Sequence, residues 1–251
     1  MNRQQTNKMH LDISKNLDEL SLRVADWLMN YIHDTLKKQD RFTIALSGGS
    51  TPKKLYELLA SAKYKNKPYW RQLHFFWGDE RFVPINDERN NAGMAMQTLL
   101  NHVPVPFSQV HPIQTDTEPQ AAATAYEKLL HEYFDNSLNS FDLVLLGLGD
   151  DGHTLSLFPG YSEVHEKENW VKSFFLKEQA MHRITITAPI VNKSSRVAFL
   201  VSGAGKASIL SRVLHGDFDP GLYPARIIQP YNGELYWFAD EAAGREIIDN
   251  S

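Results

Sequence analysis

A buried apolar run that ends in a polar turn constrains this 251-residue chain more than any other feature. The run is Leu143-Val-Leu-Leu146, and its continuous apolar character is typical of a parallel strand covered on both faces. Two glycines follow, and Asp150, Asp151 and His153 come directly after them. Because ligands of open α/β sheets bind beyond the carboxyl ends of the strands, this turn is a candidate site for chemistry.

Predicted strands alternate with predicted helices along the rest of the chain. We expect strands at 42–46, 73–77, 141–147, 183–187, 196–202 and 234–239. We expect helices at 14–38, 52–62, 91–100, 118–134, 206–214 and 240–248. This alternation predicts an α/β fold with a parallel sheet covered on both faces. A single domain over 1–251 is expected, with residues 1–10 frayed.

Composition excludes several classes of function. The net charge of −4 argues against a general nucleic-acid or membrane-surface role, so an anionic substrate would need locally placed cations. The absence of cysteine excludes disulfides, thiolate catalysis and cysteine-ligated metal sites. No apolar run approaches the ~20 residues of a membrane span, and Met1 to His10 lacks the apolar core of a signal peptide. We therefore expect a cytoplasmic protein with a small-molecule partner.

The segment Leu46-Ser-Gly-Gly-Ser-Thr-Pro52 has the character of a phosphate-binding loop. It joins a predicted strand to a predicted helix, where glycines bring N–H groups close to an anion and the helix N-terminus adds positive potential. The candidate ligands are Ser47, Gly48, Gly49, Ser50 and Thr51. The segment matches neither the dinucleotide G-x-G-x-x-G fingerprint nor the nucleotide P-loop. The alternative interpretation is an ordinary βα turn, capped by Ser50 or Thr51.

A second polar cluster follows the next predicted strand. Asp79, Glu80 and Arg81 come directly after Trp77-Gly78, where the charged groups can orient a substrate or a water molecule. The alternative interpretation is a solvated turn held by salt bridges.

The turn after the strand predicted at 141–147 holds a candidate general base. An unperturbed histidine has a pKa of ~6.5, so a histidine such as His153 can accept a proton at neutral pH, and Asp151 can orient it. The alternative is that the aspartates cap a helix and that His153 is merely satisfied. The other histidines, such as His33, His131 and His215, are predicted to be surface residues without such partners.

Two cations complete the set of candidate residues. Arg183 begins a predicted strand, and Lys206 follows the turn Ser202-Gly-Ala-Gly205 and opens a predicted helix. Either side chain can bind a phosphate or a carboxylate, and simple surface solvation is the alternative.

Together these clusters resemble the 6-phosphogluconolactonase family from Phe42 to Glu241. The matching motifs are Leu46-Ser-Gly-Gly-Ser-Thr-Pro52, Phe75-Phe-Trp-Gly-Asp-Glu-Arg81, Leu145-Leu-Gly-Leu-Gly-Asp-Asp-Gly-His-Thr-Leu-Ser-Leu-Phe-Pro-Gly160, Arg183-Ile-Thr-Ile-Thr187 and Phe199-Leu-Val-Ser-Gly-Ala-Gly-Lys206. One departure is Asn90-Asn91, where the family usually has Ser-Asn. The resemblance implies a three-layer α/β/α sandwich, Rossmann-like and shared with glucosamine-6-phosphate deaminases and ribose-5-phosphate isomerases. It also implies hydrolysis of 6-phospho-D-glucono-1,5-lactone, the second step of the oxidative pentose phosphate pathway, without metal or organic cofactor.

The resemblance and the residues together suggest roles for the candidates. The 47–51 loop, helped by Arg183 and Lys206, would hold the 6-phosphate, and His153 would activate water. Asp151 would orient His153, and Arg81 would stabilise the oxyanion or bind phosphate. Asp79 would position the water or a sugar hydroxyl. The sequence leaves open whether the protein is a monomer or a small homo-oligomer.

Two rival functions fit the same expected fold. An amino-sugar-phosphate deaminase or isomerase resembles the chain in its phosphate loop. However, that family has a glutamate five residues after the histidine, where this chain has Phe158, and an aromatic residue in place of Arg81. A non-catalytic sugar-phosphate sensor usually carries a preceding helix-turn-helix domain, whereas the residues before Phe42 predict one amphipathic helix.

Overall fold

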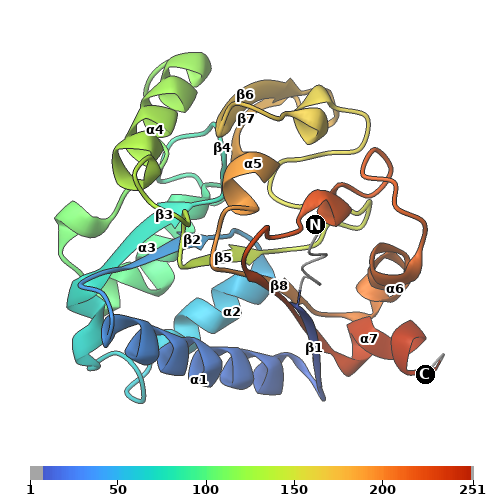
Figure 1. Cartoon of the computed structure of the whole chain (residues 1–251), viewed down its shortest axis with the longest axis horizontal. Helices are drawn as coiled ribbons and strands as arrows, with labels where there is room; N and C mark the ends of the chain where they lie inside the picture. Colours follow the sequence, from blue (N-terminus) through green and yellow to red (C-terminus); the bar gives the residue numbers. More distant parts are fainter. Residues whose placement is uncertain (1–7, 250–251) are drawn as a thin grey trace, which may run out of the picture.

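The computed structural model describes residues 8–249 and contains two sheets (Figure 1). The strands are β1 Lys8–Ser14, β2 Phe42–Leu46, β3 Leu73–Trp77, β4 Asp79–Arg81, β5 Leu143–Leu146, β6 Val171–Leu176, β7 Met181–Ile186, β8 Arg196–Val201 and β9 Glu234–Asp240. The helices are α1 Leu17–Leu36, α2 Ser50–Leu59, α3 Asn91–Thr98, α4 Pro119–Phe134, α5 Ala188–Val191, α6 Ala207–His215 and α7 Glu241–Ile248. None of these helices, within residues 8–249, is long and apolar enough to cross a membrane.

The main sheet is parallel, with the strand order β1-β9-β8-β5-β2-β3. The strand β5 lies inside the sheet, and all four of its residues are fully buried, as its apolar sequence predicts. Chain order reverses between β2 and β5, because β3 lies outside β2 while β8 and β9 follow on the other side. Such a reversal is where open α/β sheets bind ligands.

Helices cover both faces of this sheet, which confirms the predicted α/β/α layering (Figure 1). Trp27 of α1 packs against Tyr236 and Phe238 of β9. On the same strand, Trp237 instead lines a hollow with Val213 of α6. Because side chains alternate along a strand, α1 and α6 lie on opposite faces.

The N-terminal segment corrects one prediction. Residues 8–10, expected to be frayed, belong to β1, which pairs along its length with β9. The first helix therefore begins at Leu17 rather than Ser14, and the Asn16 side chain caps it by accepting a hydrogen bond from the Glu19 N–H at 3.0 Å. The remaining residues predicted to be frayed, 1–7, lie outside the described part of the chain.

The sequence did not predict the second, smaller sheet. It is antiparallel, with the order β4-β7-β6, and it contains the strand predicted at 183–187. Its other two members, β4 and β6, were not predicted, since β4 has only three residues and β6 is half exposed. The register places Arg81 of β4 directly opposite Arg183 of β7.

The histidines outside the site are more varied than the sequence predicted. His74 lies in β3 and is half buried, where its Nδ1 is 3.0 Å from the Tyr133 hydroxyl. His131 is on the surface, as predicted, but its Nδ1 lies 2.6 Å from a carboxylate oxygen of Asp135. The prediction that these residues lack partners is therefore wrong.

Candidate active site

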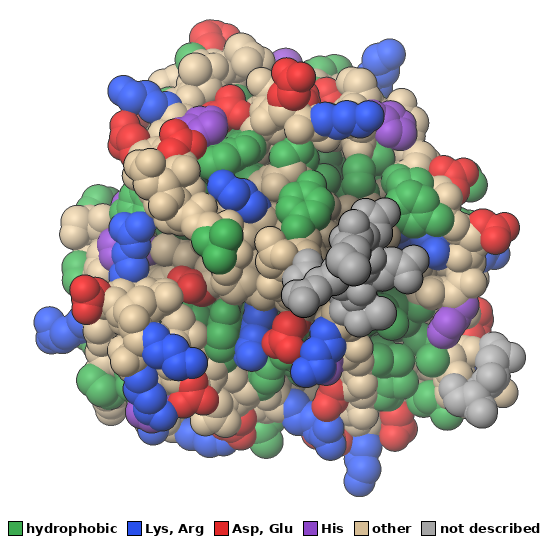
Figure 2. All heavy atoms as spheres, viewed as in Figure 1, with side chains coloured by type: hydrophobic (Ala, Val, Ile, Leu, Met, Phe, Trp, Pro, Cys, Tyr) green, Lys and Arg blue, Asp and Glu red, His purple; other side chains and the backbone are tan. Residues whose placement is uncertain are grey.

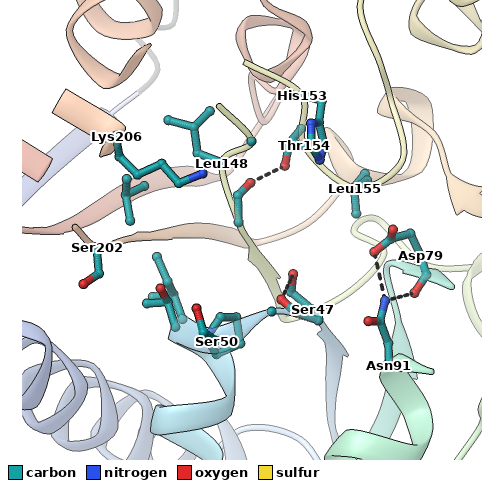
Figure 3. A pocket seen from close by; sticks show the side chains of 18 of the residues that line it. Ser47, Ser50, Asp79, Asn91, Leu148, His153, Thr154, Leu155, Ser202 and Lys206 are labelled. Carbon is teal, nitrogen blue, oxygen red and sulfur yellow. Dashed lines mark hydrogen bonds between the residues drawn. The ribbon is translucent and has the colours of Figure 1, made fainter. Parts of the chain in front are cut away.

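A cavity of about 250 Å³ opens at the carboxyl edge of the main sheet (Figure 3). The segments that follow β2, β3, β5 and β8 line it, together with Asn91 at the start of α3. Nine of the eleven predicted site residues are among its lining side chains and backbone: Ser47, Gly48, Gly49, Ser50, Thr51, Asp79, Arg81, His153 and Lys206. In Figure 3, Lys206 and Asp79 lie on opposite sides of the cavity, with Ser47 and Ser50 below them.

The loop after β2 presents the uncapped start of a helix to this cavity. Gly49 adopts φ 99°, a left-handed conformation that favours glycine, and α2 begins at the next residue. The predicted cap by Ser50 or Thr51 is wrong, since the N-cap is Gly49 and no side chain bonds the first N–H groups. Free N–H donors at a helix N-terminus are suited to binding an anion.

Two buried tyrosines fix the strand ends that precede the polar loops. The Tyr56 hydroxyl accepts a hydrogen bond from Ser47 N–H at 3.0 Å and donates to Ser47 C=O at 2.8 Å. The Tyr126 hydroxyl bonds Trp77 in the same way, at 2.8 and 2.9 Å. Each hydroxyl thus satisfies both backbone groups of one residue at the end of β2 or β3. Sequence reasoning missed both tyrosines, which look like ordinary core residues on helix faces.

Asn91, at the start of α3, connects the second polar cluster to the phosphate-type loop. Its side-chain Nδ2 donates to the Asp79 carbonyl at 2.9 Å, and its Oδ1 accepts from Arg81 Nη1 at 3.0 Å. A Cβ at Gly48 would lie 1.9 Å from the same Oδ1, so the loop can pack here only with glycine. The sequence offered one signal for this role, the Asn-Asn pair noted in the family comparison.

A buried carboxylate holds Asn91 in place. Glu80 is fully buried and accepts N–H groups from Arg81, Asn91 and Ala92 at 2.7 to 2.8 Å. Burial raises the pKa of Glu80 to about 7, against the opposing effect of these backbone donors. Glu80 therefore acts from behind the site, since it has no access to the cavity.

Asp79 is itself fixed within the wall of the cavity. One carboxylate oxygen accepts a hydrogen bond from the buried Ser156 hydroxyl at 2.6 Å. The other carboxylate oxygen lies 3.5 Å from Asn91 Nδ2. This arrangement leaves Asp79 as a rigid acceptor that can position a hydroxyl or a water molecule.

The pair formed by Asp151 and His153 has the geometry of an oriented general base. His153 Nδ1 lies 2.5 Å from an Asp151 oxygen, and the same oxygen accepts the His153 N–H at 3.0 Å. Burial raises the pKa of Asp151, but the His153 hydrogen bonds outweigh it, and the net pKa lies below its ordinary value. An ionised partner at Nδ1 keeps the proton on that nitrogen and leaves the Nε2 lone pair free to accept one.

Gly149 determines where the His153 ring can lie. A Cβ at Gly149 would be 2.0 Å from His153 Nδ1. The ring also packs against Phe158, with centroids 4.2 Å apart. Leu155, which also lines the cavity, adopts φ 56°, an uncommon conformation for a non-glycine residue that is typical of functional sites.

Lys206 reaches the cavity from the turn after β8. Gly203 opens this turn at φ 99°, as Gly49 opens the turn after β2. The Lys206 ammonium forms an ion pair with Asp150, which stands in the same turn as Asp151. The structure thus brings the predicted cation to the same cavity as His153.

Arg183 is not among the residues that line the cavity. It is buried beside Arg81, on the neighbouring strand β7, and it donates a hydrogen bond to Gln179. Burial lowers the pKa of its guanidinium, against the opposing effect of the Asp79 carboxylate. The Nε atoms of Arg81 and Arg183 are both buried without a hydrogen-bond partner in the described part of the chain. This region is therefore rich in positive charge. Because Arg183 lies outside the lining of the cavity, the geometry does not favour its direct contact with a ligand there.

The fold and the site define an α/β enzyme with an anion-binding cavity and an oriented histidine–carboxylate pair. Charges of both signs are interspersed on the molecular face in Figure 2. None of the described residues forms a cluster of His, Cys, Asp or Glu suited to a metal ion.

Comparison with known proteins identifies the family. A family model described as glucosamine-6-phosphate isomerases/6-phosphogluconolactonase matches residues 15–237. A 6-phosphogluconolactonase of Nostoc sp. is 38% identical over 244 residues, which cover 96% of this chain and 99% of that protein. The solved 6-phosphogluconolactonase of Trypanosoma brucei is 27% identical with a TM-score of 0.84, covering 96% of this chain and 100% of that one. The chain belongs to the glucosamine-6-phosphate isomerase/6-phosphogluconolactonase family.

A more distant neighbour extends the likeness in fold only. A monomeric glucosamine-6-phosphate deaminase is 19% identical, with a TM-score of 0.78 over 95% of this chain and 100% of that one. Within the family, curated relatives from Nostoc sp., Synechocystis sp. and Haemophilus influenzae are 6-phosphogluconolactonases, and the chain is an enzyme of that type.

Proposed function

We propose that this chain hydrolyses 6-phospho-D-glucono-1,5-lactone to 6-phospho-D-gluconate, the second step of the oxidative pentose phosphate pathway. The observation that carries the proposal is the oriented pair of Asp151 and His153 beside the loop of free N–H donors in one cavity. The names of the relatives support the same reaction.

The proposed mechanism begins with capture of the phosphate. The free N–H groups and hydroxyls of the 47–51 loop, together with Lys206, bind the 6-phosphate and direct C1 of the lactone towards His153. Arg81 donates to the carbonyl oxygen as negative charge develops there, and Arg183 adds positive charge behind it. Asp79 accepts a hydrogen bond from the attacking water or from a sugar hydroxyl.

His153 then carries the proton through both steps. Its Nε2 removes a proton from water while the water oxygen bonds to C1, which gives a tetrahedral oxyanion and an imidazolium. Asp151 stabilises that imidazolium. When the oxyanion collapses, the bond between C1 and the ring oxygen breaks and the imidazolium returns its proton to the ring oxygen. The new carboxyl group loses its proton to solvent.

The test is hydrolysis of freshly prepared lactone, followed through a coupled dehydrogenase, for wild type and His153→Ala. We expect acceleration by wild type and a loss of about 10²- to 10⁴-fold in the variant. The matched control is His131→Ala, because His131 also has a carboxylate partner but lies on the surface. Full activity of folded His153→Ala would exclude this base, and a wild type without acceleration would exclude the reaction.

Amino-sugar-phosphate deamination is the second candidate, and the ring of Phe158 argues against it. Phe158 lies against His153 and occupies the position where the deaminase family has a glutamate. We expect no ammonia release from glucosamine 6-phosphate. Binding of sugar phosphates without turnover of either substrate would favour the sensor function instead.

The proposal also covers the setting of the reaction. The substrate is the sole partner required, no cofactor takes part, and the cysteine-free, acidic chain acts in the cytoplasm as a monomer or small homo-oligomer. Full activity after dialysis against a chelator, and sedimentation of the active species, test the cofactor and the assembly.

A further inference from the structure

The ion pair between Asp150 and Lys206 neutralises one of the two cations of the cavity. Arg81 and Lys206 are the lysine or arginine residues among the cavity-lining side chains of the described chain. Arg81 donates to neutral acceptors, the Arg89 carbonyl and the Asn91 amide. Lys206, in contrast, is paired with a carboxylate before any substrate arrives. A phosphate that binds Lys206 therefore meets a competing anion built into the protein.

The way Asp150 is held differs from the way Asp151 is held. Asp151 accepts two hydrogen bonds from His153 within its own turn, which fixes its carboxylate. The Asp150 side chain is 85% exposed, and in residues 8–249 its polar contact is with Lys206 alone. Because nothing else orients this carboxylate, it can turn into solvent when another anion approaches. A carboxylate that positions another group, such as Asp151, is held too firmly to do so.

We propose that Asp150 competes with the phosphate of substrate and product for Lys206, and so promotes release of the product. This inference rests on the proposed function, because it takes Lys206 to meet the 6-phosphate. Hydrolysis adds a carboxylate to a molecule that already carries a phosphate, so the product is more anionic than the lactone. Return of Asp150 to Lys206 then favours departure of that product and limits inhibition by it.

If Asp150 competes with phosphate, then removing its charge should strengthen phosphate binding. Asp150→Asn keeps the size of the side chain and removes its charge, so Lys206 is free to meet the phosphate. We expect the dissociation constant of inorganic phosphate, measured by calorimetry at low salt, to fall about 2- to 5-fold, the range of an exposed ion pair. The inhibition constant of 6-phosphogluconate in the lactone assay should fall by a similar factor, and added salt should reduce the difference.

Two further variants separate competition from other effects. Asp34→Asn removes the same charge from an exposed ion pair with Lys37, 2.8 Å long, on α1, and should leave both constants unchanged. In a Lys206→Met background, Asp150→Asn should lose its effect on phosphate binding. Together these results would support a competition that acts through Lys206.

Other results would overturn the inference. Weaker or unchanged phosphate binding in Asp150→Asn would mean that Asp150 positions Lys206 or plays no part. An equal gain in Asp34→Asn would mean that only net charge matters. Wild-type protein that hydrolyses the lactone but does not bind inorganic phosphate would overturn the inference while leaving the proposed function intact. Absence of hydrolysis with the expected phosphate affinities would instead overturn the proposed function, and with it the role of Asp150 in product release, while the competition for Lys206 would stand.

Discussion

Replacing Gly149 by alanine tests the placement of His153, the proposed general base, with a single methyl group. The added Cβ would lie 2.0 Å from His153 Nδ1, and its three nearest neighbours are all atoms of that ring. Ordinary contact begins near 3.4 Å, so the ring has to move by about 1.4 Å, which breaks its 2.5 Å hydrogen bond to Asp151. A misplacement of ~1 Å can cost ~10²-fold in rate, so we expect kcat to fall on that order, or ~2.7 kcal/mol in the barrier.

The assay is the coupled measurement of lactone hydrolysis, with phosphate binding measured alongside. Gly149 does not have a positive φ, so alanine fits the backbone, and we expect phosphate affinity to stay near wild type. Gly205→Ala is the matched control, because its Cβ meets open space in the turn that precedes Lys206. In a His153→Ala background the methyl should have no further effect. A kcat of Gly149→Ala within a few-fold of wild type would refute the placement of the ring.

Three other substitutions have expected outcomes. Asp151→Asn should lower kcat by at least ~10-fold across neutral pH, because the lowered pKa of Asp151 keeps the native carboxylate ionised there. An unchanged pH–rate profile would exclude the role of Asp151 in supporting His153. Gly48→Ala should displace Asn91, which its Cβ would approach to 1.9 Å, and raise the KM for the lactone ~10-fold; steady-state kinetics check this. Burial and nearby positive charge lower the pKa of His74 to about 4. Its contribution to stability is therefore complete above pH 6.5 and is lost as the pH falls towards 4, so His74→Gln should flatten the dependence of Tm on pH in that window.

Much of the fold follows from local sequence because most strands of the parallel sheet are apolar runs that alternate with helices. The strands β2 and β3 have the predicted bounds, and β5 and β8 differ from them by a residue or two at their ends. The failures are the strands that lack this signal. β1 lies at the edge of the sheet and is half exposed, and β4 and β6 form the small antiparallel sheet. Their pairing depends on contacts between distant segments, which periodicity does not record.

The candidate site also has a part that local sequence predicts and a part that it does not. The polar turns bounded by glycines could be predicted, because each follows an apolar strand. Four of these strands end at one edge of the sheet, so side chains distant in sequence meet there. The supporting residues could not be found in this way. Tyr126 is 49 residues from the Trp77 backbone that it fixes, and no local pattern predicts that contact. The same is true of the pairing of Lys206 with Asp150, 56 residues away.

The glycines of the site link these two levels. In sequence, Gly48 and Gly149 indicate turns, yet neither has a positive φ. Each is instead required by a neighbouring side chain, since a Cβ at either position would overlap Asn91 or His153. Gly49 and Gly203 have the opposite property, with a positive φ and space for a Cβ. A glycine-rich turn therefore carries two kinds of information, one about the path of the backbone and one about the side chain that lies against it. The requirement set by a neighbouring side chain is the one specific to function. It disappears when that side chain moves away, whereas the turn of the backbone remains.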